Sequence, residues 1–214
     1  MFKPTRSSAI LIAAVASVLS LSATAHAAFL AVGATLFPAP AEPDPTGGVV
    51  VAFLAAPFNG GNYTGVLTST VIAGDPSNPF GGLTFTYQMT NDPTSVNVES
   101  RLTVNGYTSG PTIWLTDASY QVPLTGIQPG YIDRLSADVV GFSFPAPPLG
   151  VGQIPPGAQS TLLVVQTNAP LFKDSFASVI DGTIAMAPTF APNPEPTTLA
   201  LLGLGGLALI RRRR

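Results

Sequence analysis

Cysteine and histidine, the side chains that serve most often in nucleophilic catalysis and zinc binding, are almost missing from this 214-residue chain. It contains no cysteine, and its one histidine, His26, lies in the N-terminal region. Disulfides and thiolate metal sites are therefore excluded. Ser-His-Asp and Cys-His catalysis and ordinary zinc sites are excluded for a mature form that lacks His26. Phosphate-binding loops of GxxxxGKS/T or GxGxxG spacing are also absent from the body of the chain.

Charge is scarce as well, at 9% of residues, and it is unevenly distributed. Six of the nine basic residues lie at the two ends of the chain. Between Ala28 and Asn193, three basic residues stand against ten acidic ones, which gives this part a net charge of −7. An acidic body repels phosphate groups, so nucleic acid is not expected as a partner.

The N-terminus has the order of parts that is typical of a secretory signal. Two basic residues within positions 1–6 precede an apolar run at 9–21, and the small residues Ala25 and Ala27 follow. We expect the signal peptidase to cleave between Ala27 and Ala28. The apolar run is shorter than the roughly 20 residues needed to span a bilayer, which favours a cleaved signal over the alternative of a retained anchor helix. No twin arginine is present, so the general secretion route is expected.

The C-terminus also consists of three parts in a fixed order. The sequence Pro194, Glu195, Pro196 is followed by an apolar run at 197–210 and by four arginines, Arg211, Arg212, Arg213 and Arg214. As a helix the apolar run reaches about 21 Å. That is short for a hydrocarbon core of about 30 Å, although bilayer thinning and flanking residues can compensate. The arginines are expected to hold this end on the cytoplasmic side.

This tail resembles the PEP-CTERM sorting signal of bacterial exported proteins, which has the same three parts in the same order. The resemblance covers 194–214. It implies recognition by an exosortase, processing near the Pro-Glu-Pro motif, a transient anchor in the inner membrane, and delivery to the cell surface or the extracellular space. A plain C-terminal anchor behind a proline-rich stalk is the alternative.

The chain is predicted to divide into four parts: a signal peptide at 1–27, a proline-rich extended segment at 28–47, a β domain at 48–191 and the sorting signal at 192–214. Strand signals within the β domain lie at 48–56, 63–73, 83–90, 95–104, 112–118, 136–144 and 160–167, with a further pair around Asp181-Gly182. The alternation of apolar and polar residues is clearest at 83–90 and 95–104, and it predicts half-buried strands in which Val96 faces the core and Glu99 faces solvent.

No segment of the mature part has helical periodicity, and turn residues separate the strand signals. We therefore predict an all-β fold, an antiparallel β-sandwich of the jelly-roll or immunoglobulin-like kind. An N-terminal signal helix and a short C-terminal transmembrane helix are expected to flank it.

Carboxylates are the remaining candidates for chemistry. Two of Glu99, Asp117, Asp133 and Asp138 could act as the paired acids of a glycosidase, although their flanks carry no catalytic motif. Asp75, Asp92 and Asp133 are loop candidates for weak calcium binding, without the Asp-x-Asp/Asn-x-Asp/Asn-Gly spacing of a calcium loop. The simplest interpretation is that these acids are structural or solvating. We predict no catalytic residue, no metal and no cofactor.

Aromatic residues offer one other possibility, a stacking platform for sugars. The candidates are Tyr107, Trp114, Tyr120 and Tyr131, although a core tryptophan is the commoner outcome for a strand such as 112–118. Arg101 is expected to pair with Glu99 or with an acid on a neighbouring strand.

Taken together, these patterns predict a non-enzymatic structural or interaction protein of the cell surface or extracellular matrix. The expected partners are the general secretion machinery, the signal peptidase and an exosortase. A carbohydrate-binding module for exopolysaccharide is the first alternative, and a secreted hydrolase with paired carboxylates is the second.

Overall fold

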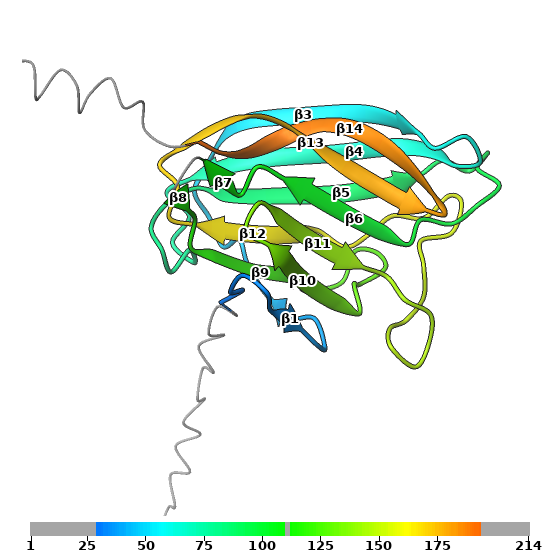
Figure 1. Cartoon of the computed structure of the whole chain (residues 1–214), viewed down its shortest axis with the longest axis horizontal. Coiled ribbons are helices and arrows are strands. Elements are labelled where there is room, and N and C mark those ends of the chain that lie inside the picture. Colours follow the sequence, from blue (N-terminus) through cyan, green and yellow to red (C-terminus); the bar gives the residue numbers. More distant parts are fainter. Residues whose placement is uncertain (1–28, 110–111, 194–214) are drawn as a thin grey trace, which may run out of the picture.

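The computed structural model describes residues 29–109 and 112–193, and the regular structure in these ranges consists of β-strands without a helix (Figure 1). The all-β prediction is therefore confirmed. None of the described residues forms a helix long and apolar enough to cross a membrane. The predicted signal helix with Ala25 and Ala27, and the predicted C-terminal helix with Arg211–Arg214, lie outside the described residues.

The strands form two six-stranded sheets in the described part of the chain. Sheet A contains, in spatial order, β2 (Ala41–Glu42), β9 (Thr116–Gln121), β12 (Leu163–Thr167), β5 (Thr84–Asn91), β4 (Thr64–Ala73) and β3 (Val49–Asn59). Sheet B contains β1 (Thr35–Leu36), β10 (Tyr131–Ser136), β11 (Val139–Ser143), β6 (Arg101–Asn105), β13 (Leu171–Asp181) and β14 (Thr183–Asn193). A small pair, β7 (Thr108–Ser109) and β8 (Thr112–Ile113), lies apart from both sheets in the hydrogen-bonding pattern.

Strand pairs in both sheets are antiparallel except β2–β9, which is parallel. The chain passes between the sheets several times, so that β6 pairs with β13 and β5 pairs with β12. Figure 1 shows the edge strands β3 and β14 running along the same side of the molecule, where they are in contact. The segment before residue 48 is not a separate appendage, because β1 and β2 each add a short edge strand to a sheet.

One hydrophobic core fills the space between the two sheets. Phe85, Tyr87 and Met89 enter it from β5, and Leu102 and Val104 enter it from β6. Successive side chains of a strand point to opposite faces, so the alternation read from the sequence places these residues correctly. Burial of such side chains contributes roughly 1.5 to 3 kcal/mol each, which makes this shared core the main source of stability.

The segment 95–104 departs from the predicted strand. The strand β6 begins only at Arg101, and the amides of Val96 and Asn97 donate to the carbonyl of Asn62 instead of continuing the ladder. The alternation is broken at this point, so Val96 is 83% exposed and Glu99 is fully buried. The prediction of a core-facing Val96 and a solvated Glu99 is wrong for this reason.

Two other predicted strands are interrupted. The segment 112–118 contains the whole of β8 and the start of β9, with Trp114 and Leu115 between them. The segment 136–144 contains the turn between β10 and β11, whose register shifts between Asp133 and Ser136. The hairpin predicted at Asp181-Gly182 is confirmed: Asp181 pairs with Thr183, and Gly182 adopts a positive φ of 69°, a conformation that glycine accepts without steric cost.

The outer face of sheet A is covered at one end. Thr84 and Thr86 are buried on this face, whereas Thr90 on the same strand is exposed. The cover is the β4–β5 connection, in which Asn78 donates from its side-chain amide to the carbonyls of Gly82 and Thr167 and to Thr84. This loop creates a second buried layer, outside the main core and more polar than it.

Candidate functional site

The aromatic residues considered as a sugar platform are mostly inside the protein. Tyr107, Trp114 and Tyr120 are buried, and Tyr131 is half-buried. The hydroxyl of Tyr107 lies 2.9 Å from that of Tyr87 in the core. Burial raises the pKa of both phenols, so they stay protonated. These side chains stabilise the fold and do not form an exposed stacking surface.

Two of the four candidate catalytic carboxylates are held by local partners. Asp133 accepts two hydrogen bonds from the Arg101 guanidinium, at 2.6 and 2.8 Å, and Arg101 also donates to Ser143. Arg101 was expected to pair with Glu99 or with a neighbouring strand's acid, and both expectations are wrong, because Asp133 lies on β10 and β11 separates it from β6. The guanidinium reaches Asp133 across Gly141 of β11, which has no side chain to block it. Asp138 accepts from the amide and the hydroxyl of Thr108, at 3.1 and 2.8 Å.

Glu99 is the most deeply buried carboxyl of the four. Neither of its oxygens has a hydrogen-bond partner within residues 29–109 and 112–193. One oxygen lies close to Gly65, at 3.1 Å from the position that a Cβ would take there. Burial, with a smaller effect from Asp181, raises the pKa of Glu99 to about 8. Glu99 is therefore a protonated, neutral acid at neutral pH.

Asp117 is buried on the other side of sheet A. Burial, together with the nearby charge of Asp44, raises the pKa of Asp117 to about 7. The acid that raises the pKa of Glu99 is thus a different residue from the acid that raises the pKa of Asp117. Asp133 and Asp138 have other neighbours again, so the four candidates do not share one.

The three acids considered as loop ligands for calcium are also engaged, and Asp133 lies on strand β10 and not on a loop. Asp75 accepts hydrogen bonds from Ser77, Thr84 and Gln166. Asp92 accepts from the amide and hydroxyl of Thr94, and Asp133 is paired with arginine. Over the described ranges, no group of three or more His, Cys, Asp or Glu side chains is arranged to hold a metal ion.

Arg134 has a structural position that the sequence did not indicate. Its side chain is buried, and the guanidinium donates to the carbonyls of Tyr107, Trp114 and Ala137 at 2.9 to 3.3 Å. These contacts tie β10 to the β7–β8 region. The guanidinium donors of Arg134 are bonded to main-chain carbonyls, so this side chain stabilises the fold.

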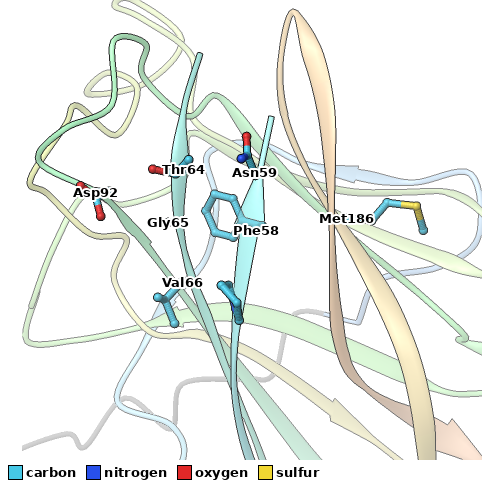
Figure 2. Close-up of a pocket in the computed structure, with 8 residues that line it drawn as sticks. Phe58, Asn59, Thr64, Gly65, Val66, Asp92 and Met186 are labelled. Atoms are coloured by element: carbon cyan, nitrogen blue, oxygen red, sulfur yellow. The ribbon is translucent and has the colours of Figure 1, made fainter. Parts of the chain in front are cut away.

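An open depression lies at one end of β3 and β4 (Figure 2). Its polar side chains are Asn59, Thr64 and Asp92, of which Asn59 and Asp92 accept from neighbouring main-chain amides. Figure 2 shows Met186 of β14 pointing away from the other labelled side chains. A second, smaller hollow of about 190 Å³ is lined by Phe37, Tyr120 and several prolines and glycines.

Large apolar side chains are exposed on the edge strands of both sheets. On β3 they are Val49, Val50, Val51 and Phe53, and on the β13–β14 hairpin they are Phe176, Ile184 and Met186. Soluble proteins seldom leave such residues grouped on neighbouring strands unless the surface has a role in interaction. The three valines lie at the start of β3, whereas Met186 lies beside Pro57 and Asn59 near its end.

Comparison with known protein families decides which signal the chain carries. The family description "PEP-CTERM protein-sorting motif" matches residues 194–214. The chain carries this sorting motif. The resemblance noted for the C-terminal tail is therefore confirmed, and it supports an exported protein that an exosortase processes. No curated protein and no solved structure matches the chain.

The PEP-CTERM motif begins directly where the described fold ends. Strand β14 stops at Asn193 after pairing with β13 along its whole length, and the matched residues start at Pro194. The residues Pro194, Glu195 and Pro196, and the arginines after them, lie outside the described residues.

One group of residues was missed by sequence reasoning, although part of its pattern was visible. Thr84, Asp117 and Gln166 lie on three neighbouring strands and form one row across the outer face of sheet A. The polar character of this face could be read from 83–90. The pairing of β9 with β12 and β5 could not, because these strands are distant in sequence.

Proposed function

We propose that this protein is an exported, exosortase-processed component of the cell surface or extracellular matrix, with a structural or interaction role and without catalytic activity. The observation that carries the proposal is the PEP-CTERM motif at 194–214. The large apolar side chains that are exposed on β3 and on the β13–β14 hairpin support an interaction role. The non-catalytic part is supported by the engagement of Asp133 and Asp138 with local partners.

The proposal extends to the fold and to the route of delivery. The two sheets that share one core are proposed to be a β-sandwich, with jelly-roll or immunoglobulin-like connectivity as the finer assignment. The signal peptide ending at Ala27, the general secretion machinery, the signal peptidase and a transient stop in the inner membrane belong to the same proposal. The final location is the cell surface or the extracellular space.

Intact-mass analysis of the native exported protein tests the delivery route. The expected product lacks residues 1–27 and has lost Arg211–Arg214. A matched preparation from cells without the exosortase should retain the arginines in the membrane fraction. Finding the four arginines on the final, stably membrane-bound form of cells with the exosortase would favour a plain C-terminal anchor.

Carbohydrate binding is the second candidate, and it now depends on a different surface. Phe37 is 58% exposed at the small hollow that Tyr120 and Gly130 also line. An exposed aromatic ring beside a hollow is a surface on which a sugar ring can stack. A glycan array with the processed protein and with its Phe37→Ala variant provides the test: binding that disappears in the variant supports this candidate, and an absence of binding removes it.

A further inference from the structure

The start of β3 carries three consecutive apolar side chains that nothing in the fold covers. Val49, Val50 and Val51 are 46% to 68% exposed. Successive side chains of a strand point to opposite faces, so exposure of three in a row means that neither face is covered. The register with β4 shifts between Val50 and Ala52, which makes Val51 the extra residue of a bulge. β3 is also the last strand of sheet A, and its sequence contains no charged residue.

The chain leaves the fold at this same end of the molecule. The edge strands β3 and β14 are in contact, and two hollows between them fix their relative direction. Phe58 and Met186 line the open depression of Figure 2, whereas Leu54 and Pro188 line a second hollow further along. A step toward the start of β3 is therefore a step toward Asn193 at the end of β14. Figure 1 shows the start of β3 and the end of β14 at one end of the molecule.

Two more exposed apolar side chains lie near this exit. Leu171 of β13 pairs directly with Asn193, the last residue of β14. The amide of Leu115 donates at 2.9 Å to the side chain of Asn168, which precedes Leu171 by three residues. Three separate parts of the fold thus contribute to one apolar surface around the exit. We call it the exit patch, and it consists of Val49, Val50, Val51, Leu115 and Leu171.

The exit patch is separated from a membrane-seeking segment by a very short length of chain. Only Pro194, Glu195 and Pro196 stand between Asn193 and the apolar run at 197–210, which belongs to the PEP-CTERM motif. Three extended residues reach about 10 Å. A surface joined to a bilayer by so short a linker meets the lipid at a high effective concentration, because no second diffusional encounter is needed.

The distribution of the exit patch favours a lipid surface over a second copy of this chain. A second copy that paired with the free edge of β3 would cover the valines alone. A flat apolar layer at the exit can contact β3, β13 and the connection between β8 and β9 together. The charged residues nearest to Leu171 on β13 are Lys173 and the exposed Asp174, one of each sign. Contact through this surface therefore requires no anionic lipid.

We propose that the exit patch docks the folded domain onto the lipid bilayer while the C-terminal run is anchored there. The proposal rests on the transient membrane stop described above. Apolar side chains at a bilayer surface enter the boundary between headgroups and acyl chains by about 5 to 10 Å, and the valines of β3 take this position. The membrane then covers the exit end, and the turn between β3 and β4 points away from it.

Single-cysteine labelling of the full chain tests this orientation. The chain has no cysteine, so Val50→Cys and Val96→Cys each carry one environment-sensitive fluorophore at a defined place. Val96 is exposed, and its amide donates to the carbonyl of Asn62 in the turn after β3, at the end of that strand opposite to Val50. Each labelled protein is reconstituted through its C-terminal run into phosphatidylcholine vesicles.

Two quenchers report where each label lies. A nitroxide attached to the lipid near the headgroup end of the acyl chain should quench the label at position 50 several-fold more than the label at position 96. Iodide in the water should give the reverse order. Raising NaCl from about 0.1 M to about 1 M shortens the Debye length from about 10 Å to about 3 Å. This change should leave the lipid quenching at position 50 unaltered, because the contact is apolar.

A matched pair of substitutions shows whether the exit patch causes the docking. Val49→Asp places a charge beside the label at position 50 and should bring its lipid quenching down to that at position 96. Val96→Asp makes the same change at the far end and should leave the quenching at position 50 unaltered. Both valines are exposed, so neither substitution is expected to unfold the domain.

Three results would overturn the docking. Equal iodide access at positions 50 and 96 on vesicle-bound protein refutes it and leaves the anchoring of the C-terminal run intact. Protection from iodide without lipid quenching, rising with the ratio of protein to lipid, means that a second copy covers the patch instead. Protein that does not float with the vesicles contradicts the anchoring as well, and both proposals then fail.

Discussion

Replacing Arg134 with methionine is expected to lower the free energy of unfolding by about 3 to 5 kcal/mol. The guanidinium donates to three main-chain carbonyls, those of Tyr107, Trp114 and Ala137, from a buried position. Methionine occupies a similar volume but has no donor. The carbonyls of Tyr107 and Trp114 each keep a second donor, so the three lost hydrogen bonds are expected to cost about 1 to 1.5 kcal/mol each, which gives the expected range. Chemical denaturation followed by tryptophan fluorescence measures it, because Trp114 lies at the affected site.

The matched control removes the positive charge of Lys173, which is also in sheet B but is half-exposed instead of buried. Lys173→Met, at a half-exposed residue of β13, is expected to change stability by no more than about 0.5 kcal/mol. A loss of less than 1 kcal/mol in Arg134→Met would contradict the role assigned to the guanidinium, since it would mean that water or rearranged main chain satisfies the three carbonyls equally well.

Glu99 is expected to make the protein less stable as the pH rises. Its pKa in the folded protein is raised to about 8 from a usual value of 4.5, chiefly by burial. Between these two values the folded state holds a proton that the unfolded state has released. The free energy of unfolding therefore falls with increasing pH in this window, by at most about 1.4 kcal/mol per pH unit, and levels off above pH 8.

The variant Glu99→Gln should remove this contribution. The amide has the size of the acid and carries no charge at any pH, so the variant should exceed the wild type in stability at pH 9 by several kcal/mol and approach it near pH 4.5. Denaturation midpoints measured every half pH unit provide the comparison. Asp117 also titrates in an overlapping range, but it is present in both proteins and cancels in their difference. Asp174→Asn should reproduce the wild-type profile, and parallel profiles of Glu99→Gln and wild type would refute the assignment.

The sequence predicts best those strands in which alternate residues face the core. At 83–90 a strict alternation gave the orientation of Phe85, Tyr87 and Met89 correctly, because side-chain period and burial agree along the whole segment. At 95–104 the same argument failed. Alternate residues share one face of a sheet only where the strand is continuous, and this segment is not a continuous strand. Nothing local indicates that β6 begins at Arg101 and that the preceding residues hydrogen-bond to the loop at Asn62.

The candidate sites were less predictable than the fold, because their residues are far apart in the sequence. The Asp117–Gln166 pair exists because β9 and β12 are neighbours in sheet A, and the burial of that pair depends on a loop that folds over the sheet. Two of the three carbonyls that Arg134 binds belong to Trp114 and Tyr107, which precede it by 20 and 27 residues. Such relations are set by strand pairing, which a single sequence does not encode locally. The C-terminal motif, by contrast, is contiguous, so it could be recognised directly.

The end of β14 at Asn193 leaves almost no tether between the fold and the membrane. Only Pro194, Glu195 and Pro196 precede the apolar run, and three extended residues reach about 10 Å. While the motif is in the bilayer, a completely folded domain must therefore rest nearly against the lipid headgroups. If the exosortase acts near Pro-Glu-Pro, as we propose, it has to work in the narrow gap between the folded domain and the bilayer. A short insertion after Asn193 would widen this gap and leave the motif unchanged. Its effect on processing would show how much space the enzyme needs, independently of the motif that it recognises.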